Sequence, residues 1–290
     1  MKNTFWYSSG NQEPEKSRLL ALSEEEKAEL TELSCQMNHT VKEDQFCFIL
    51  DGLSRREISD TELQTHISNT YNDQAILNLC LGDPVQISIA FHTYLWKKSN
   101  QNILLTGNDA ENTFDILASV IRSACIQNYK TIVLADEKNI YFKLLKKYLS
   151  VIDPQKKLII LENKNDIEQL ILKTTDILKE DDIEVKFFLI WLGAESYELD
   201  TEMIWNSGKN GILNLLAVQN FKDFSAIKDL DLSRFEYRIS TKTDKEELLA
   251  FGYPYSQIVN LELDSVNAVY YNASKLVTFK PYCISKEENE

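Results

Sequence analysis

Residues 102–127 set the strictest limit on how this chain folds. Residues 103–106 form a short apolar run that is typical of a buried strand. Gly107 and Asp109 lie in the polar turn that interrupts the run. From Thr113 onward, apolar side chains recur at the spacing of one helix face: Phe114, Ile116, Leu117, Val120, Ile121, Ala124 and Cys125. The pattern predicts a strand, a tight turn and an amphipathic helix in that order.

The same alternation continues along the chain. Apolar runs predict strands at 102–106, 131–135, 157–161, 185–192 and 212–218, and the segments between them predict helices at 112–127, 138–149, 165–178 and 196–206. Strands that alternate with helices are typical of a mostly parallel sheet covered by helices on both faces. A strand at 235–240, a helix at 243–251 and a hairpin formed by 268–271 and 276–279 follow. We therefore predict an α/β fold.

The region before this alternation reads differently. Residues 1–22 are polar and are expected to be a flexible N-terminus. Residues 23–75 are expected to form an extension, with a helix at 23–37, a strand at 45–50 and a helix at 60–71; Ser23 and Glu26 have capping-box spacing. The main domain is placed at 76–282, and it begins with strands at 76–81 and 85–90 around a turn at 82–84. A charged tail, 283–290, ends the chain.

Length and charge narrow the function classes. The chain has 290 residues, which suits one large domain or one domain with an extension. Its net charge of −14 has the wrong sign for a protein that binds duplex DNA by itself, although a local basic groove stays possible. Five scattered cysteines indicate free thiols in a reducing compartment. The sequence starts without an apolar signal region and contains no membrane-spanning run, so we expect a cytoplasmic protein with no membrane contact.

The strand, turn and helix at 102–127 have the frame of a phosphate-binding loop, in which a helix N-terminus favours an anion. A working loop reads G-x-x-x-x-G-K-[ST]. When that pattern is aligned on Gly107, Asn112 stands at the second glycine, Thr113 at the lysine and Phe114 at the hydroxyl that holds Mg²⁺. Two interpretations stay open, a degenerate anion-binding loop and an ordinary turn of a parallel sheet.

No catalytic or metal site is predicted. The apolar strand near 187–192 should end in a carboxylate in a nucleotide hydrolase, but Glu195 comes late and is typical of an exposed helix start. Asp136 and Glu137 follow the strand at 131–135, where α/β sites form, and they are equally typical of a helix N-terminus. The three histidines, His39, His66 and His92, lack metal-ligand spacing.

Several blocks of the sequence, taken together, resemble the C-terminal, degenerate RecA-like domain of FtsK/SpoIIIE/HerA-type DNA translocase ATPases. The resemblance covers residues 76–282, and it rests on the order and spacing of the blocks at 81–85, 102–109, 211–221, 235–239, 268–272 and 279–282. It implies a RecA-like P-loop NTPase fold. It also implies that residues 107–113 match the Walker A turn, that Leu192 and Gly193 match the Walker B end, and that Gln219 matches a polar strand-end residue.

The residues that the resemblance assigns to nucleotide binding are Gly107, Asn108, Asp109, Asn112, Thr113 and Gln219. Because the Walker A lysine and the Walker B acid are both missing, the resemblance implies a domain without turnover, with no cofactor or with weakly bound ATP. The expected role is structural or regulatory, in a DNA-translocating, secretion or DNA-defence assembly, with a protein partner and with oligomerisation possible. The segment from Ser23 to Leu50 is the expected contact to that partner.

Two alternatives stay open. The first is a weak ATPase whose site is completed in trans by a partner. The second is a doubly wound enzyme that processes a small molecule or a nucleic acid, with Asp136 and Glu137 in its site.

Overall fold

The computed structural model describes residues 4–7, 15–18, 55–70, 76–84, 90–107, 109–127, 129–135, 138–162, 187–197, 201–219, 231–241, 244–259, 261, 267–272 and 274–284, with isolated positions between 165 and 173. The chain divides into two compact units, Met1–Gly52 and Leu53–Glu290. In the first unit, strands β1 (Thr4–Tyr7) and β2 (Glu15–Arg18) pair antiparallel, which the sequence did not predict. The predicted helix at 23–37 and strand at 45–50 lie outside the described residues.

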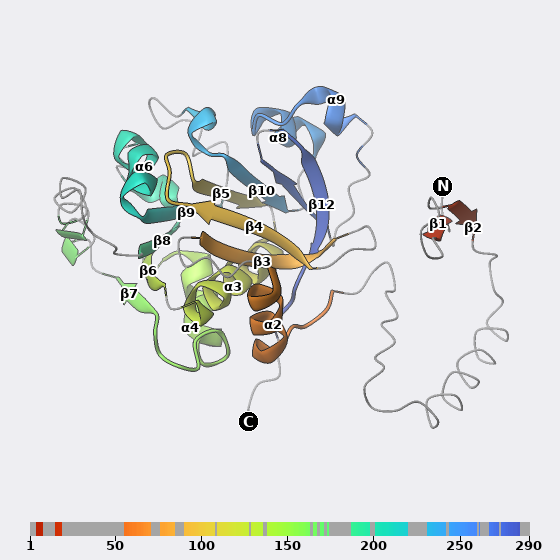
Figure 1. Ribbon diagram of the computed structural model, residues 1–290. Helices are drawn as coiled ribbons and strands as arrows, with labels where there is room; N and C mark the ends of the chain where they lie inside the picture. Colours follow the sequence, from red (N-terminus) through yellow and green to blue (C-terminus); the bar gives the residue numbers. More distant parts are fainter. Residues whose placement is uncertain are drawn as a thin grey trace, which may run out of the picture. The chain divides into compact units, whose positions relative to one another are not determined.

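The second unit is built on one ten-stranded sheet with the order β4-β3-β12-β11-β10-β5-β9-β8-β6-β7 (Figure 1). From β10 to β7 every pairing is parallel, and from β4 to β10 every pairing is antiparallel. The strands are β3 (Ile76–Pro84), β4 (Phe91–Trp96), β5 (Asn102–Gly107), β6 (Lys130–Ala135), β7 (Ile159–Leu161), β8 (Phe187–Leu192), β9 (Ile212–Val218), β10 (Tyr237–Thr241), β11 (Ala268–Tyr271) and β12 (Leu276–Pro281).

Helices cover both faces of this sheet, as the sequence predicted. The helices are α2 (Asp60–Thr70), α3 (Ala110–Ile126), α4 (Ile140–Ile152), α6 (Thr201–Ser207), α8 (Lys245–Ala250) and α9 (Tyr255–Ile258), with short 3-10 turns η1 (Ala194–Ser196), η2 (Gly208–Asn210) and η3 (Leu232–Arg234). Alternate residues of β5 separate the two faces: Ile103 and Leu105 pack in the core under α3 and α4, and Leu104 packs in the core with α6, α8 and α9. The predicted α/β class is confirmed.

Two predictions differ from the structure, and a third falls outside the residues that it describes. Residues 82–84 continue β3 instead of turning, because glycine at 82 lets the chain of β12 approach: an added Cβ would lie 2.0 Å from the Lys280 carbonyl oxygen. The predicted strand at 85–90 falls almost entirely outside the described residues, and the partner of β3 is β4 at Phe91–Trp96. Helix α6 begins at Thr201, after the η1 turn, and is shorter than predicted.

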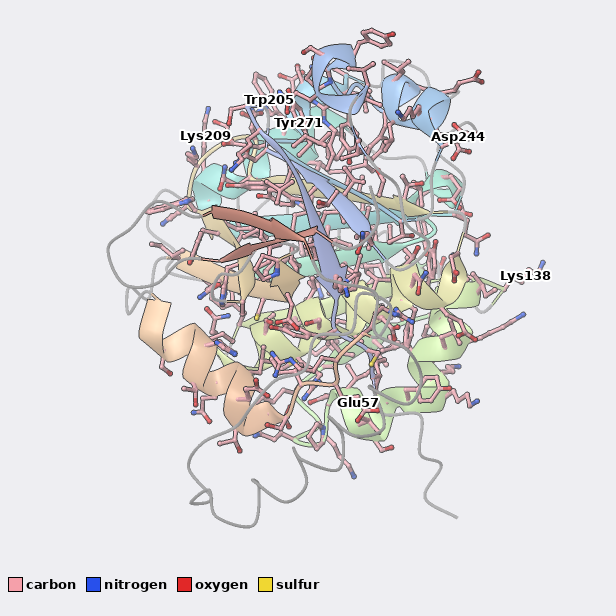
Figure 2. All side chains as sticks on the ribbon, turned by 90° about the vertical axis from the view of Figure 1, so that its right-hand side faces the viewer. Glu57, Lys138, Trp205, Lys209, Asp244 and Tyr271 are labelled. Carbon is pink, nitrogen blue, oxygen red and sulfur yellow. The ribbon has the colours of Figure 1, made fainter. Side chains whose placement is uncertain are left out.

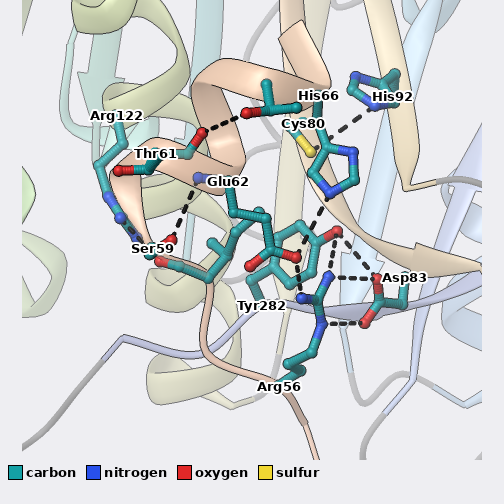
Figure 3. A network of polar contacts seen from close by, with 12 residues as sticks. Arg56, Ser59, Thr61, Glu62, His66, Cys80, Asp83, His92, Arg122 and Tyr282 are labelled. Atoms are coloured by element: carbon teal, nitrogen blue, oxygen red, sulfur yellow. Dashed lines mark hydrogen bonds and ion pairs between the residues drawn. The ribbon is translucent and has the colours of Figure 1, made fainter. Parts of the chain in front are cut away.

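Residues 55–60 are fastened to the sheet and to α3 by three arginines. Arg55 Nη1 lies 2.6 Å from the Asp115 carboxylate, which is buried on α3. Arg122 of α3 pairs with Asp60 at 2.6 Å, where α2 begins. Arg56 makes the third attachment, and it does so through the cluster drawn in Figure 3.

The Arg56 cluster consists of Arg56, Glu62, His66, Asp83 and Tyr282 (Figure 3). The guanidinium donates from Nε and Nη2 to the two oxygens of Asp83, at 3.1 and 3.2 Å, and also pairs with Glu62. The Tyr282 hydroxyl donates to Asp83 at 3.0 Å, and its ring lies under the guanidinium. Paired charges and a forked geometry make such contacts stronger than exposed ion pairs. The cluster therefore holds α2 against β3 and β12.

Candidate functional site

The carboxyl ends of four adjacent parallel strands meet at one edge of the sheet. Thr241 of β10 pairs with Gly107 of β5, Thr106 pairs with Val218 of β9, and Ala217 pairs with Leu192 of β8. Loops that leave parallel strands at this edge form the sites of α/β proteins. Figure 2 shows this edge on the side of the molecule that carries Lys138, which follows β6, and Asp244, which follows β10. Trp205 and Lys209, which precede β9, lie on the opposite side. The edge collects most of the residues that the sequence selected.

Asp109 occupies the N-terminus of α3 with its own carboxylate. The side chain accepts hydrogen bonds from the backbone amides of Glu111 at 3.0 Å and Asn112 at 3.2 Å. The Asn112 side-chain amide donates to the second carboxylate oxygen at 3.1 Å. The first amides of a helix have no partner inside the helix and are the donors that bind a phosphate. Here a carboxylate of the same chain already accepts from two of them.

Thr113, at the lysine position of a phosphate-binding loop, points into the protein and is fully buried. Its hydroxyl donates to the Asp109 carbonyl oxygen at 2.8 Å and lies 2.7 Å from the hydroxyl of Thr241. An added Cβ at Gly107 would lie 1.8 Å from that Thr241 hydroxyl oxygen. Glycine at 107 therefore permits the close approach of Thr113 and Thr241, which ties the start of α3 to the end of β10.

The neighbouring strand end carries Gln219, Glu195 and Tyr141. The Gln219 backbone amide donates to Glu195 at 3.2 Å, which links the end of β9 to the η1 turn after β8. Tyr141, buried at the start of α4, lies with its hydroxyl 3.4 Å from the Val218 carbonyl oxygen. Burial raises the pKa of Tyr141, and the nearby carboxylates of Glu195 and Asp109 add to the shift. Tyr141 is therefore a neutral hydrogen-bonding group at physiological pH.

The predicted residues are placed as follows. Gly107, Asp109, Asn112 and Thr113 lie together at the start of α3, and Gln219 follows the strand that pairs with β5. Asn108, Asp136 and Glu137 lie outside the described residues.

The sequence missed Tyr141 and Thr241, which complete this cluster. Asn139 caps α4 by accepting from the Tyr141 amide at 2.9 Å, so the cap was a readable signal for where that helix begins. Nothing local marked Thr241, which lies 128 residues from Thr113.

Two further features of the described residues bear on the site. Within the ranges that the structure describes, no three His, Cys, Asp or Glu side chains are grouped so that they could hold a metal ion. In that part of the chain, no helix is long and apolar enough to cross a bilayer.

No family model matches the sequence, and no curated protein matches it. Among solved structures, the chain is similar to the cytoplasmic domain of EssC, with a TM-score of 0.54 and 12% identity over 96% of this chain and 57% of that one. ATPases 2 and 3 of EssC from Geobacillus thermodenitrificans give a TM-score of 0.59 and 15% identity over 90% of this chain and 50% of that one. The pCW3 conjugation coupling protein TcpA, in a structure with ATPγS, gives a TM-score of 0.50 and 11% identity over 79% of this chain and 69% of that one.

These likenesses establish the fold. The chain has the α/β RecA-like fold of the P-loop ATPases, with a parallel half-sheet and helices on both faces. It spans about half the length of the two EssC structures that it matches.

Proposed function

We propose that this chain is a RecA-like domain that does not hydrolyse ATP and that serves as a structural or regulatory part of a larger assembly. The observation that carries the proposal is the Asp109 carboxylate, which accepts from the Glu111 and Asn112 amides at the start of α3. A phosphate would have to displace this carboxylate or approach it, and two like charges in that position repel each other.

The groups that drive phosphoryl transfer are also absent from their expected places. Thr113, in place of the lysine, brings no positive charge and faces Thr241. Strand β8 ends at Leu192 and is followed by Gly193, so neither position carries a carboxylate, and Glu195 accepts from the Gln219 amide. Phosphoryl transfer depends on a cation, Mg²⁺ and a positioned carboxylate or amide. These features support a domain with no nucleotide or with weakly bound ATP.

The similar folds support a proposal for the kind of assembly. The similar structures include ATPases 2 and 3 of EssC and a conjugation coupling protein. The type VII secretion ATPase EccC is a further similar structure, which matches 74% of this chain with a TM-score of 0.50. We propose that the chain acts in the cytoplasm with a protein partner in a DNA-translocating, secretion or DNA-defence assembly of the FtsK/HerA type. Its charge of −14 opposes direct binding to duplex DNA.

The first test is turnover by the full chain with Mg²⁺ and ATP. We expect no phosphate release above that of a mock purification. If release is seen, Glu195→Gln separates its sources, because the change keeps the shape of this half-buried side chain and removes its charge. Release that disappears in Glu195→Gln would contradict the proposal, whereas release that persists points to contamination. Turnover that arises only on mixing with a partner would favour the alternative of a site completed in trans.

The second test addresses the carboxylate itself. Asp109→Ala frees two amides and removes a negative charge, so we expect pyrophosphate to bind more tightly to this variant than to the wild type. Asp231→Ala is the matched control, because Asp231 caps a different turn by accepting from Ser233 at 2.9 Å. Calorimetry that shows tight, Mg²⁺-dependent ATP binding by the unchanged chain would overturn the proposal.

A further inference from the structure

Helices α8 and α9 lie next to each other (Figure 1) and present three apolar side chains to solvent. Leu249 is 42% exposed, Tyr255 is 67% exposed and Val259 is 44% exposed. Leu249 lies one turn after Lys245 on α8, and Val259 is the C-cap of α9, one turn after Tyr255. The Lys245 ammonium donates to the Val259 carbonyl oxygen at 2.8 Å, which brings these two faces together. We call Leu249, Tyr255 and Val259 the α8–α9 patch.

The helices under the patch are rigidly attached. Their opposite faces bury Leu248 and Ile258 in the core with Val269 and Tyr271 of β11. The Gln257 side chain accepts from the Leu276 amide at 2.8 Å and donates to the Ser274 carbonyl at 3.3 Å, so α9 is bonded to the start of β12. Arg238 donates to the Phe251 carbonyl between the helices at 2.8 Å. The patch is therefore a fixed surface, which costs a partner little ordering entropy.

The charges around the patch select its partner. The first turn of α8 and its cap carry Asp244, Glu246 and Glu247, against the single cation Lys245, whose ammonium bonds to Val259. A second copy of a chain of net charge −14 would bring more negative charge to this rim. Opposite charge at the rim speeds encounter and excludes wrong partners, whereas like charge at an interface is unfavourable.

We infer that the α8–α9 patch is a docking surface for a basic, apolar segment of a partner protein. Asp244, the N-cap of α8, follows β10, whose last residue pairs with Gly107, so the acidic first turn of α8 lies on the side of the sheet that carries the candidate site. The inference rests on the proposed function only in assuming a protein partner, and it does not depend on the absence of turnover.

The test uses the full chain and a synthetic amphipathic helix of about five turns, with leucines on one face and lysines on the other. Fluorescence anisotropy measures the affinity at about physiological salt, where the Debye length of about 8 Å limits non-specific attraction between charges. We expect Leu249→Ser with Tyr255→Ser to weaken binding by about tenfold or more. The matched control is the double variant Ile140→Ser and Ile159→Ser. These two side chains are exposed to a similar degree but lie outside the α8–α9 patch, so the control should leave the affinity unchanged.

Two further arms decide the chemistry. A peptide with glutamates in place of the lysines should not bind, and Glu246→Lys should weaken binding of the basic peptide. Equal loss of affinity in the two serine pairs, or no loss in either, would overturn the inference. Concentration-dependent dimerisation that Leu249→Ser abolishes would show a second copy on the patch and would also overturn it. Turnover measured on the same proteins reports separately on the proposed function.

Discussion

The loop at the start of α3 and the Arg56 cluster both attach chain segments to the sheet, but they do so with different chemistry. The loop uses short-range bonds: the Asp109 carboxylate accepts from amides two and three residues later, and one hydroxyl pair reaches Thr241. The Arg56 cluster uses paired charges, and it joins residues that lie 27 and 226 positions from Arg56. Local bonds re-form as soon as the helix forms, whereas the charged cluster depends on the whole sheet being assembled.

This difference predicts where the fold is most sensitive. Loss of one member of a partly buried cluster of charges leaves its partners charged and unpaired, which costs more than loss of a helix cap. Four substitutions test the comparison, two near the Arg56 cluster and two at the start of α3. Their expected effects on stability decrease from the first to the last.

The largest effect is expected for Arg56→Ala. Asp83 and Glu62 would keep their charges without the guanidinium, so we expect a loss of about 3 kcal/mol in the free energy of unfolding. Although burial by itself lowers the pKa of Arg56, its hydrogen bonds to Asp83 and Glu62 outweigh this and raise it. Urea unfolding measures the loss. Arg56→Lys keeps the charge without the fork and should lose less, and a loss of under about 0.5 kcal/mol in Arg56→Ala would place the cluster among ordinary surface pairs.

A pH dependence should appear in the same region. Burial, with a smaller effect of the nearby His66, lowers the pKa of His92 from 6.5 to about 4. The folded state therefore holds His92 neutral, and its stability falls as the pH drops from 6.5 towards 4, because the unfolded chain takes up the proton first. A shift of this size corresponds to about 3 kcal/mol near pH 4, and we expect about 2 kcal/mol because His92 stays partly exposed to solvent.

His92→Gln should lose this component and give a flatter stability profile between pH 6.5 and 4 than the wild type. His66→Gln keeps His92 buried and should retain most of the slope. Parallel profiles for the wild type and His92→Gln would mean that His92 does not control acid stability.

In the loop region, Gly107→Ala should cost about 1.5 kcal/mol, because the new Cβ meets the Thr241 hydroxyl and overpacks the start of α3. Thermal or urea unfolding measures the loss. Thr241→Ala removes the closest atom, so the double variant should be more stable than the sum of the two single changes predicts. Simple additivity would show that the hydroxyl is not what limits residue 107.

The smallest effect is expected for Asp109→Ala, which removes the cap of α3 and should cost about 1 kcal/mol. Asp109→Asn keeps a side-chain oxygen at the cap and should cost less. A loss as large as that of Arg56→Ala would contradict the comparison, because the loop would then be as sensitive as the charged cluster.

Much of the fold was readable because its signals are local. The apolar run and helical spacing at 102–127 predicted β5 and α3, and the later alternation predicted the parallel strands β6, β8 and β9. The hairpin of β11 and β12 was also confirmed. The glycine at 82 was misread as a turn, because a glycine in a strand that admits a neighbouring backbone looks the same in sequence as one that ends it.

The candidate site was only partly readable, for a related reason. Gly107, Asp109, Asn112 and Thr113 are close in sequence, and the P-loop pattern selected them together. Tyr141 carries no motif, and its place beside Val218 follows from the neighbouring order of β5, β9, β8 and β6. The sequence also does not predict whether the Thr113 side chain points into the protein or toward solvent. Its burial against Thr241 depends on the assembled sheet.

The sequence by itself determined the α/β class and the strand-turn-helix frame around Gly107, because side-chain periodicity and turn residues act over a few positions. When the P-loop pattern is aligned on Gly107, the sequence also places Thr113 at the lysine position and no carboxylate at Leu192 or Gly193. Only the tertiary structure decided that β10 lies beside β5, that Thr241 closes on Thr113, and that Arg56 reaches Asp83 and Tyr282. Those contacts depend on strand order, which results from packing of the entire sheet and is encoded in no single segment.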